Sequence, residues 1–240
     1  MALILATTQA GSAQVTTSNG AAVQTSDAAP VASSPAPAPP KLPVYRPPGV
    51  TGGILPVRVG GGSRGAAAGG VTVEVLVPDH VALTTQAQPS LYWYLSKPAT
   101  TLCEVTLTEP KIAKPLLILK SGTPTKAGLH VIKLSDYKVH LDPNVIYKWS
   151  VAVIVDPENR SEDIIANGVI ERIDPTPALS AQLASASESE RPALYVGASI
   201  WYDALATLSD LIAQNPQDKA LRDQRTALLE QVGLHGVSID

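Results

Sequence analysis

Short apolar stretches bounded by turn-forming residues recur between residues 71 and 173, and they limit what this chain can fold into. The first, Val71–Val77, has valine at every second position, which is the pattern of a strand that buries one face. Further stretches follow at spacings of roughly 8–12 residues. They cover residues 81–85, 90–95, 101–108, 116–119, 129–134, 145–155 and 164–173. We therefore predict an antiparallel β-sandwich over residues 71–174.

Aromatic residues in these stretches indicate the kind of sandwich. Tyr147 stands near the start of a long apolar strand, directly after the turn-forming segment Leu141–Asn144. In immunoglobulin-like domains, a tyrosine at this place braces the turn through its hydroxyl group. We therefore predict an immunoglobulin-like fold in which Tyr147, Trp149 and Trp93 have structural roles.

The pattern changes from strands to helices after residue 174. Thr176 and Pro177 suit the cap and the first position of a helix. Ser187 and Glu190 have the spacing of a capping box. An amphipathic pattern over residues 199–214 predicts a longer helix. We predict three to four helices over residues 175–236.

Turn-forming residues delimit the last of these helices. Asn215 could cap it, with Pro216 at its first position, and Gly233 could end it. The segment also resembles a partial tetratricopeptide repeat, because Ala204 and Leu208 have the small-then-large spacing of such a repeat. Only about one and a half repeats fit, whereas these repeats need several neighbours to bury their faces.

The helices are therefore expected to pack on the sandwich. Trp201 and Tyr202 are candidate anchors for this packing, and also candidate contacts for a protein partner.

Residues 1–55 have the composition of a disordered export and spacer sequence. Residues 7–40 are mostly Ala, Thr, Ser, Gln, Val and Pro, and Asp27 is their one charge, so they cannot bury enough apolar surface to fold. Nine prolines between Pro30 and Pro56 favour a stiff spacer. The first 13 residues resemble the end of a signal peptide, although no Lys or Arg precedes Lys41. The alternative is an ordinary disordered N-terminus.

Residues 56–70 form a glycine-rich loop that leads into the first predicted strand. Residues 61–65 read Gly-Gly-Ser-Arg-Gly, which matches the letters of a hydrolase nucleophile motif. That motif needs a strand before the serine and a helix after it, and the flanking residues provide neither. We expect a flexible loop in which Arg64 can pair with a carboxylate.

The chain lacks the residue patterns of common cofactor and metal sites. Its four histidines, His80, His130, His140 and His235, are not at metal-ligand spacing. The lone Cys103 lies in an alternating strand and is expected to be buried. A net charge of −3 does not indicate nucleic-acid binding. No apolar run reaches the ~18 residues of a transmembrane helix. We expect no cofactor and no transmembrane segment.

The densest polar cluster is Asp156-Pro-Glu-Asn-Arg-Ser-Glu-Asp163. One interpretation is a turn with solvated charges. A weaker one is a calcium site with oxygen ligands from Asp156, Glu158, Asn159 and Asp163. A third is that Arg160 pairs with a carboxylate and braces the structure. Arg160 is also a candidate contact for a partner.

Several segments resemble one known family. They include GGSRG at 61–65, YWYL at 92–95, DPENRSEDI at 156–164, IERIDPTPALSAQL at 170–183 and IWYDALATL at 200–208. Over residues 56–236 the chain resembles the cyanobacterial family known as domain of unknown function 928. The resemblance implies an exported protein and assigns no activity. It also implies that a disulfide common in the family is missing, because Ala66–Ala68 and Val155 stand where the family often has cysteines.

These observations favour a non-enzymatic, exported binding or structural module that contacts proteins at the cell surface or in the periplasm. One alternative is a cell-surface hydrolase that uses the carboxylates near Asp156–Asp163. Another is a fibre subunit that assembles as a homo-oligomer by donating an N-terminal strand. An enzyme needs a pocket with converging titratable groups. A binding module exposes an apolar patch or a free strand edge.

Overall fold

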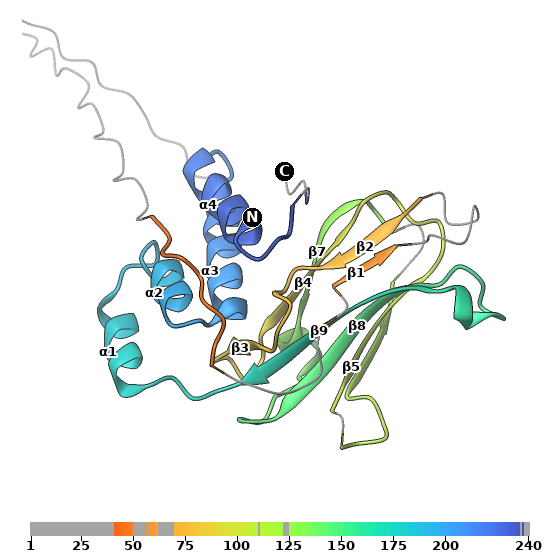
Figure 1. The fold of residues 1–240 in the computed structure, drawn as a ribbon, viewed down its shortest axis with the longest axis horizontal. Coiled ribbons are helices and arrows are strands. Elements are labelled where there is room, and N and C mark those ends of the chain that lie inside the picture. The colour runs from red at the N-terminus through yellow and green to blue at the C-terminus, as the bar shows by residue number, and fades with distance from the viewer. Residues whose placement is uncertain are drawn as a thin grey trace, which may run out of the picture. The chain divides into compact units, whose positions relative to one another are not determined.

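Two β-sheets and four α-helices make up the part of the chain that the structure describes (Figure 1). The structure is a computed structural model, and it describes residues 41–49, 56, 58–61, 70–109, 111–121, 125–235 and 237. These residues belong to one unit, Ala38–Asp240. Residues 1–40 and 50–55 of the predicted spacer, together with Arg64 and most of the glycine-rich loop, lie outside the described residues.

The first sheet has four antiparallel strands in the order β1-β2-β4-β7. They are β1 (Val59–Gly61), β2 (Thr72–Val75), β4 (Ser90–Leu95) and β7 (Gly128–Lys133). The second sheet has five strands in the order β3-β9-β8-β5-β6, and only β3 and β9 run parallel. They are β3 (Ala82–Thr84), β5 (Cys103–Thr108), β6 (Leu117–Lys120), β8 (Ile146–Val153) and β9 (Ile164–Arg172). The prediction of a mainly β chain with helices at its C-terminal end is confirmed.

Alternation along the strands builds the core between the sheets. In β5, every second residue from Cys103 to Leu107 is buried. Leu107 lies opposite Trp149 of β8, and Trp149 lies opposite Gly168 of β9. A Cβ atom on Gly168 would stand 2.6 Å from the indole Nε1 of Trp149. The glycine therefore makes room for the largest side chain of the core.

Tyr147 braces a turn, as its place in the sequence predicts. The Tyr147 side chain is 1% exposed, and its hydroxyl accepts a hydrogen bond of 2.9 Å from the backbone N–H of Asp142. This bond joins the start of β8 to the turn five residues upstream. Trp93 and Trp149 are also buried in the core.

The helices are α1 (Pro177–Ser185), α2 (Arg191–Gly197), α3 (Trp201–Gln214) and α4 (Lys219–Glu230). Thr176 caps α1 as predicted, because its side chain accepts a hydrogen bond from the N–H of Leu179. The predicted start of the last helix at Asn215 and Pro216 is wrong. Asp218 is the cap of α4, since its carboxylate accepts hydrogen bonds from the N–H groups of Ala220 and Leu221.

The last turn after α4 ends at Gly233, as the sequence predicts. Gly233 has a φ of +77°, and its N–H bonds to the carbonyl of Glu230. The N–H of Leu234 bonds to the carbonyl of Leu229. This pair of bonds is the usual glycine-dependent end of a helix.

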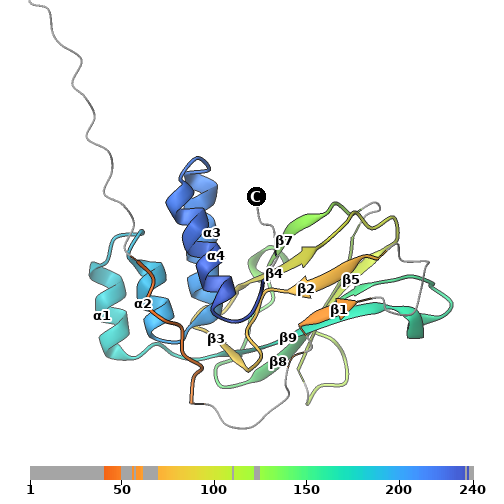
Figure 2. The same cartoon turned by 45° about the horizontal axis from the view of Figure 1, so that its top comes forward.

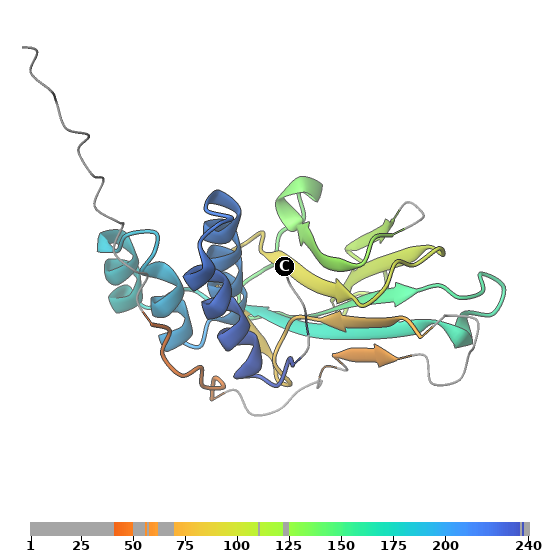
Figure 3. The same ribbon diagram turned by 90° about the horizontal axis from the view of Figure 1, so that it is seen from above.

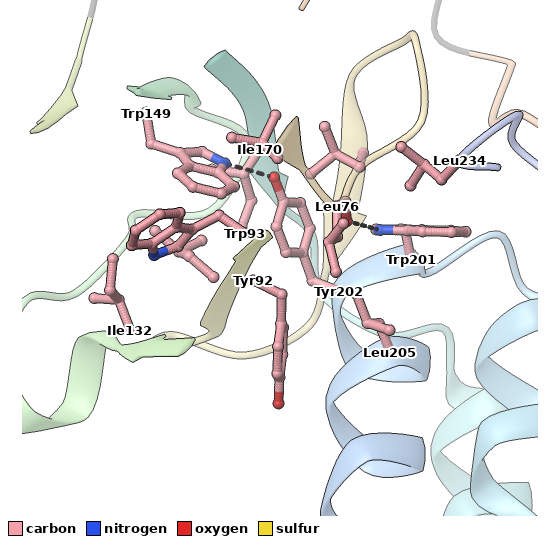
Figure 4. Packing of buried hydrophobic residues seen from close by; sticks show 14 of the residues in the cluster. Leu76, Tyr92, Trp93, Ile132, Trp149, Ile170, Trp201, Tyr202, Leu205 and Leu234 are labelled. Carbon is pink, nitrogen blue, oxygen red and sulfur yellow. Dashed lines mark hydrogen bonds between the residues drawn. The ribbon is translucent and has the colours of Figure 1, made fainter. Parts of the chain in front are cut away.

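The helices and the sandwich share one hydrophobic core (Figure 4). The first turn of α3 makes the connection. Trp201 donates a hydrogen bond of 2.8 Å from its indole N–H to the carbonyl of Leu76, next to β2. Tyr202 accepts one of 2.9 Å from the indole N–H of Trp149. Figure 2 shows α3 beside β3 and β4, which it also contacts.

The partner-contact interpretation of Trp201 and Tyr202 is therefore corrected. Their side chains are 0% and 1% exposed, so they lie inside the domain and anchor α3 to the sheets. The prediction of a loop over residues 56–70 is wrong at Val59–Gly61, which form β1 although their sequence lacks an alternating pattern.

Candidate functional site

The two sides of the sandwich are closed in different ways. On one side, β1 passes so close to β9 that a Cβ atom on Gly60 would stand 2.6 Å from the backbone of Ile165. The other side ends in β7 in one sheet and in β6 in the other, and each is an edge strand. Figure 3 shows β1 (orange) and β7 (green) on opposite sides of the sandwich.

A groove of about 180 Å³ opens between these two edge strands. Its lining includes Trp93, Cys103, Val105, Leu119, His130 and Tyr137, and we call it the β6–β7 groove. The strand register explains the lining, because Leu119 pairs with Val105 and His130 pairs with Trp93. The groove is therefore the open end of the hydrophobic core between the sheets.

His130 covers the tryptophan at the groove. Its imidazole ring stacks on the indole of Trp93, with the ring centroids 4.1 Å apart and the planes 16° from parallel. Its Nε2 lies 2.8 Å from the carbonyl oxygen of Lys126, which fixes the ring. Because the imidazole ring of His130 is flat and only partly buried, this side of the groove stays accessible.

Two large side chains of the groove lining are exposed. Val131 on β7 is 46% exposed and Tyr137, just after β7, is 47% exposed. Tyr137 belongs to the short 3-10 helix η2 (Leu134–Tyr137), which follows β7. Apolar side chains gathered around a groove are typical of an interaction surface.

Two lysines flank β7. Lys126 precedes β7 and Lys133 ends it, and both are exposed. Among the described residues, neither of them forms a salt bridge, whereas Lys120 on β6 lies 3.8 Å from Glu104. Positive charge at both ends of β7 disfavours a cationic ligand there.

A family model matches residues 59–240, which is more than half of the chain. The family is described as Domain of Unknown Function (DUF928). The chain belongs to the DUF928 family. The matched range contains every strand and helix described above, so the β6–β7 groove is part of the DUF928 domain. No curated protein matches the sequence.

The charged hairpin of this DUF928 domain is braced by Arg160. The guanidinium group donates hydrogen bonds of 2.6 Å to Asp163 and of 3.1 Å to Glu104 on β5. These two bonds raise the pKa of Arg160. The bracing interpretation of the sequence is the one that the structure bears out. Arg160 sits in the 3-10 turn η3 (Arg160–Glu162) and is about half exposed.

The proposed calcium ligands are not brought together into a site. Asp156 accepts a hydrogen bond from the N–H of Glu158, and Asn159 donates one to Glu162. Asp163 is engaged with Arg160. In the described ranges, no group of three or more His, Cys, Asp or Glu side chains could hold a metal ion.

Cys103 lies at the floor of the β6–β7 groove. It is 1% exposed, and burial raises the pKa of its thiol. A thiol of this kind is a poor nucleophile, because the reactive form is the thiolate. Cys103 therefore acts as a small apolar side chain of the core, as its place in the sequence predicts.

A second hollow, of about 270 Å³, lies between α2, α3 and the loop after β3. Its lining is polar and includes Gln86, Glu188, Arg191, Tyr195 and Asp210. Sequence reasoning did not single out any of these residues, because they come from three separate segments. Two carboxylates and a tyrosine share this hollow, but no described contact joins them into a catalytic arrangement.

A buried carboxylate, Asp203, stands behind this hollow. It is 4% exposed and accepts hydrogen bonds from Thr84 Oγ1 at 2.6 Å, from the N–H of Thr85 at 3.1 Å and from Gln86 Nε2 at 3.3 Å. Burial raises the pKa of Asp203, and these hydrogen bonds oppose part of that rise. Asp203 ties the first turn of α3 to the end of β3, which gives it a structural role.

Proposed function

We propose that this DUF928 domain is a non-catalytic, exported module that contacts another protein through the β6–β7 groove. The observation that carries the proposal is an apolar groove between β6 and β7, each of which lies at the edge of its sheet among the described residues. An edge strand presents free N–H and C=O groups to any further strand. Main-chain hydrogen bonds would then supply affinity, and the groove would supply pockets for side chains.

The strand order of the described residues supports an immunoglobulin-like interpretation in which one strand of the usual set is not present among them. In that fold, strands A, B, E and D form one sheet and C, F and G the other. Strands β2, β4 and β7 have the order of A, B and E, and β5, β8 and β9 have that of C, F and G. The place of strand D, beside β7, is where the β6–β7 groove opens. A strand from a partner would complete the sheet there.

Export is supported by the sequence of residues 1–55. Its signal-like start and its proline-rich stretch suit a domain that is held away from a membrane or wall. In the described part of the chain, no helix combines the length and the apolar character needed to cross a membrane.

The test compares two lysine substitutions on strands of the same domain. Val131→Lys places a charge on the edge of β7, where lysine opposes strand addition. Ile165→Lys is the matched control, because Ile165 on β9 is 45% exposed and Val131 is 46% exposed. The native size of the protein is measured by size-exclusion chromatography of extracts from cells that produce it.

The wild-type chain and Ile165→Lys should elute in an assembly larger than the single 25.0 kDa chain. Val131→Lys should elute as the single chain. Loss of the assembly in both variants, or in neither, would show that the groove is not the contact surface.

A further inference from the structure

We propose that the β6–β7 groove accepts a strand from the N-terminal segment of a second copy of this chain, within residues 14–29. This inference rests on the proposed function, because it identifies what docks in the groove. Four observations support it: the form of the groove, the composition of the segment, the charges around β7 and the attachment of the segment to its own domain.

The form of the groove suits a strand with small side chains. β7 has six residues, so a strand paired along it would extend over roughly 20 Å. Alternate side chains of the added strand would point into the groove, beside His130 and Leu119. A hollow of about 180 Å³ admits alanine, threonine or valine side chains but not a row of aromatic ones.

Residues 14–29 have a suitable sequence, QVTTSNGAAVQTSDAA. Valine and threonine stand at positions 15, 16, 17, 23 and 25, and β-branched residues favour strands. Proline, which cannot donate a backbone hydrogen bond to a sheet, is absent from this range. The segment can therefore form the continuous backbone ladder that strand addition needs.

The charges of the segment and the groove are compatible. Lys126 and Lys133 stand at the two ends of β7, and both are exposed. The first 40 residues contain no Lys or Arg, and Asp27 is their one charged side chain. A docked segment would therefore meet no repulsion at either end of β7, whereas a lysine-rich segment would be repelled.

The attachment of the segment favours a second copy over its own groove. Tyr45 is held on the helical side, because its N–H bonds to Gln231 and its ring packs on Trp201 at a centroid distance of 5.1 Å. Between residue 29 and this anchor lie six prolines, from Pro30 to Pro43. Proline-rich sequence favours a stiff, extended spacer, which disfavours insertion of the segment into its own groove.

Repetition of this contact would produce a chain of copies, since donor and acceptor are different surfaces of one molecule. A head-to-tail contact of this kind does not close on itself unless its rotation forms a ring. The proposed partner is therefore a strand of the next copy that has small and β-branched side chains and a single charged one, Asp27.

Disulfide trapping in the full-length chain tests this inference. Val23→Cys is combined with Val131→Cys on β7, and Val15→Cys with Val131→Cys covers a shifted register. Cys103 is buried, and its raised thiol pKa keeps it from competing. After mild oxidation, the products are separated on a non-reducing gel. The matched control combines Val23→Cys with Ile165→Cys.

The expected result is a ladder of covalent multiples of the 25.0 kDa chain that requires the cysteine at position 131. An internal disulfide in a single chain would show that the segment fills its own groove, and it would overturn the second-copy assignment. An absence of disulfides, or equal ladders with the cysteine at position 165, would overturn docking at β7. If Val131→Lys still dissociates the cellular assembly in that case, the groove binds a different protein and the proposed function stands.

Discussion

Replacement of Tyr202 by phenylalanine should destabilise the whole domain, because the Tyr202 hydroxyl joins α3 to the sandwich. The hydroxyl accepts a hydrogen bond from Trp149 Nε1 at 2.9 Å and lies 3.3 Å from the carbonyl oxygen of Val169. Trp149 is 0% exposed, so without the hydroxyl its N–H is buried without a partner. Such a loss costs about 1–3 kcal/mol of unfolding free energy.

Urea unfolding followed by tryptophan fluorescence measures this cost, since all three tryptophans are buried. For an m-value of about 2 kcal/mol per molar, the midpoint should fall by roughly 0.5–1.5 M. Tyr94→Phe is the matched control, because Tyr94 on β4 is only partly buried and makes no hydroxyl hydrogen bond to a described residue. Equal midpoints for Tyr202→Phe and Tyr94→Phe, or separate transitions for helices and sandwich, would refute the reasoning.

Three further predictions concern stability. Gly168→Ala should lower the unfolding free energy by about 1–3 kcal/mol through overpacking, because its Cβ would stand 2.6 Å from Trp149 Nε1. Calorimetry measures this loss, and Gly49→Ala is the control, since a Cβ at position 49 meets nothing within 4 Å. The pKa of Asp203 is raised in the folded state, so its contribution to stability is present below its unfolded pKa and is lost as the pH rises through its folded pKa. The unfolding free energy of the wild type minus that of Asp203→Asn should therefore fall as the pH rises from about 4 to 8, and a difference that stays level or grows would contradict the burial argument. Arg160→Ala should lower the unfolding free energy by about 1–3 kcal/mol, because it leaves the carboxylate of Asp163, whose side chain is 2% exposed, without its ion-pair partner, and urea titration measures this loss.

Local patterns were sufficient for most strands and helices. The run of residues 90–95 is observed as β4 with the predicted bounds, because alternation and the flanking turn residues are local signals. Thr176 and Gly233 also act as predicted, since capping depends on a few adjacent residues. These features needed no knowledge of the tertiary structure.

Features that depend on distant segments were not predictable. β1 is a strand because it pairs with β2 and passes over Ile165, and Val59-Gly-Gly61 carries no such signal by itself. Trp201 and Tyr202 were candidates for both packing and partner contact, and only the position of α3 against β2 and β8 decides.

The β6–β7 groove could not be located from the sequence for the same reason. Its lining residues come from β4, β5, β6 and β7, and the groove exists because β6 and β7 end their sheets on the same side. The sequence predicts the strands and their buried faces, but the order of strands within each sheet is set by non-local pairing. Which strands lie at the sheet edges follows only from that order.

Amide hydrogen exchange of β7 tests the central claim most directly. Exchange is measured by mass spectrometry for residues 128–133 in the assembly isolated from producing cells and in the single chain that it releases. Strand addition in the β6–β7 groove predicts that these amides exchange more slowly in the assembly, while those of β8 and β9, which are paired on both sides, change little. Equal exchange of residues 128–133 in the two samples, with protection gained elsewhere, would contradict the account.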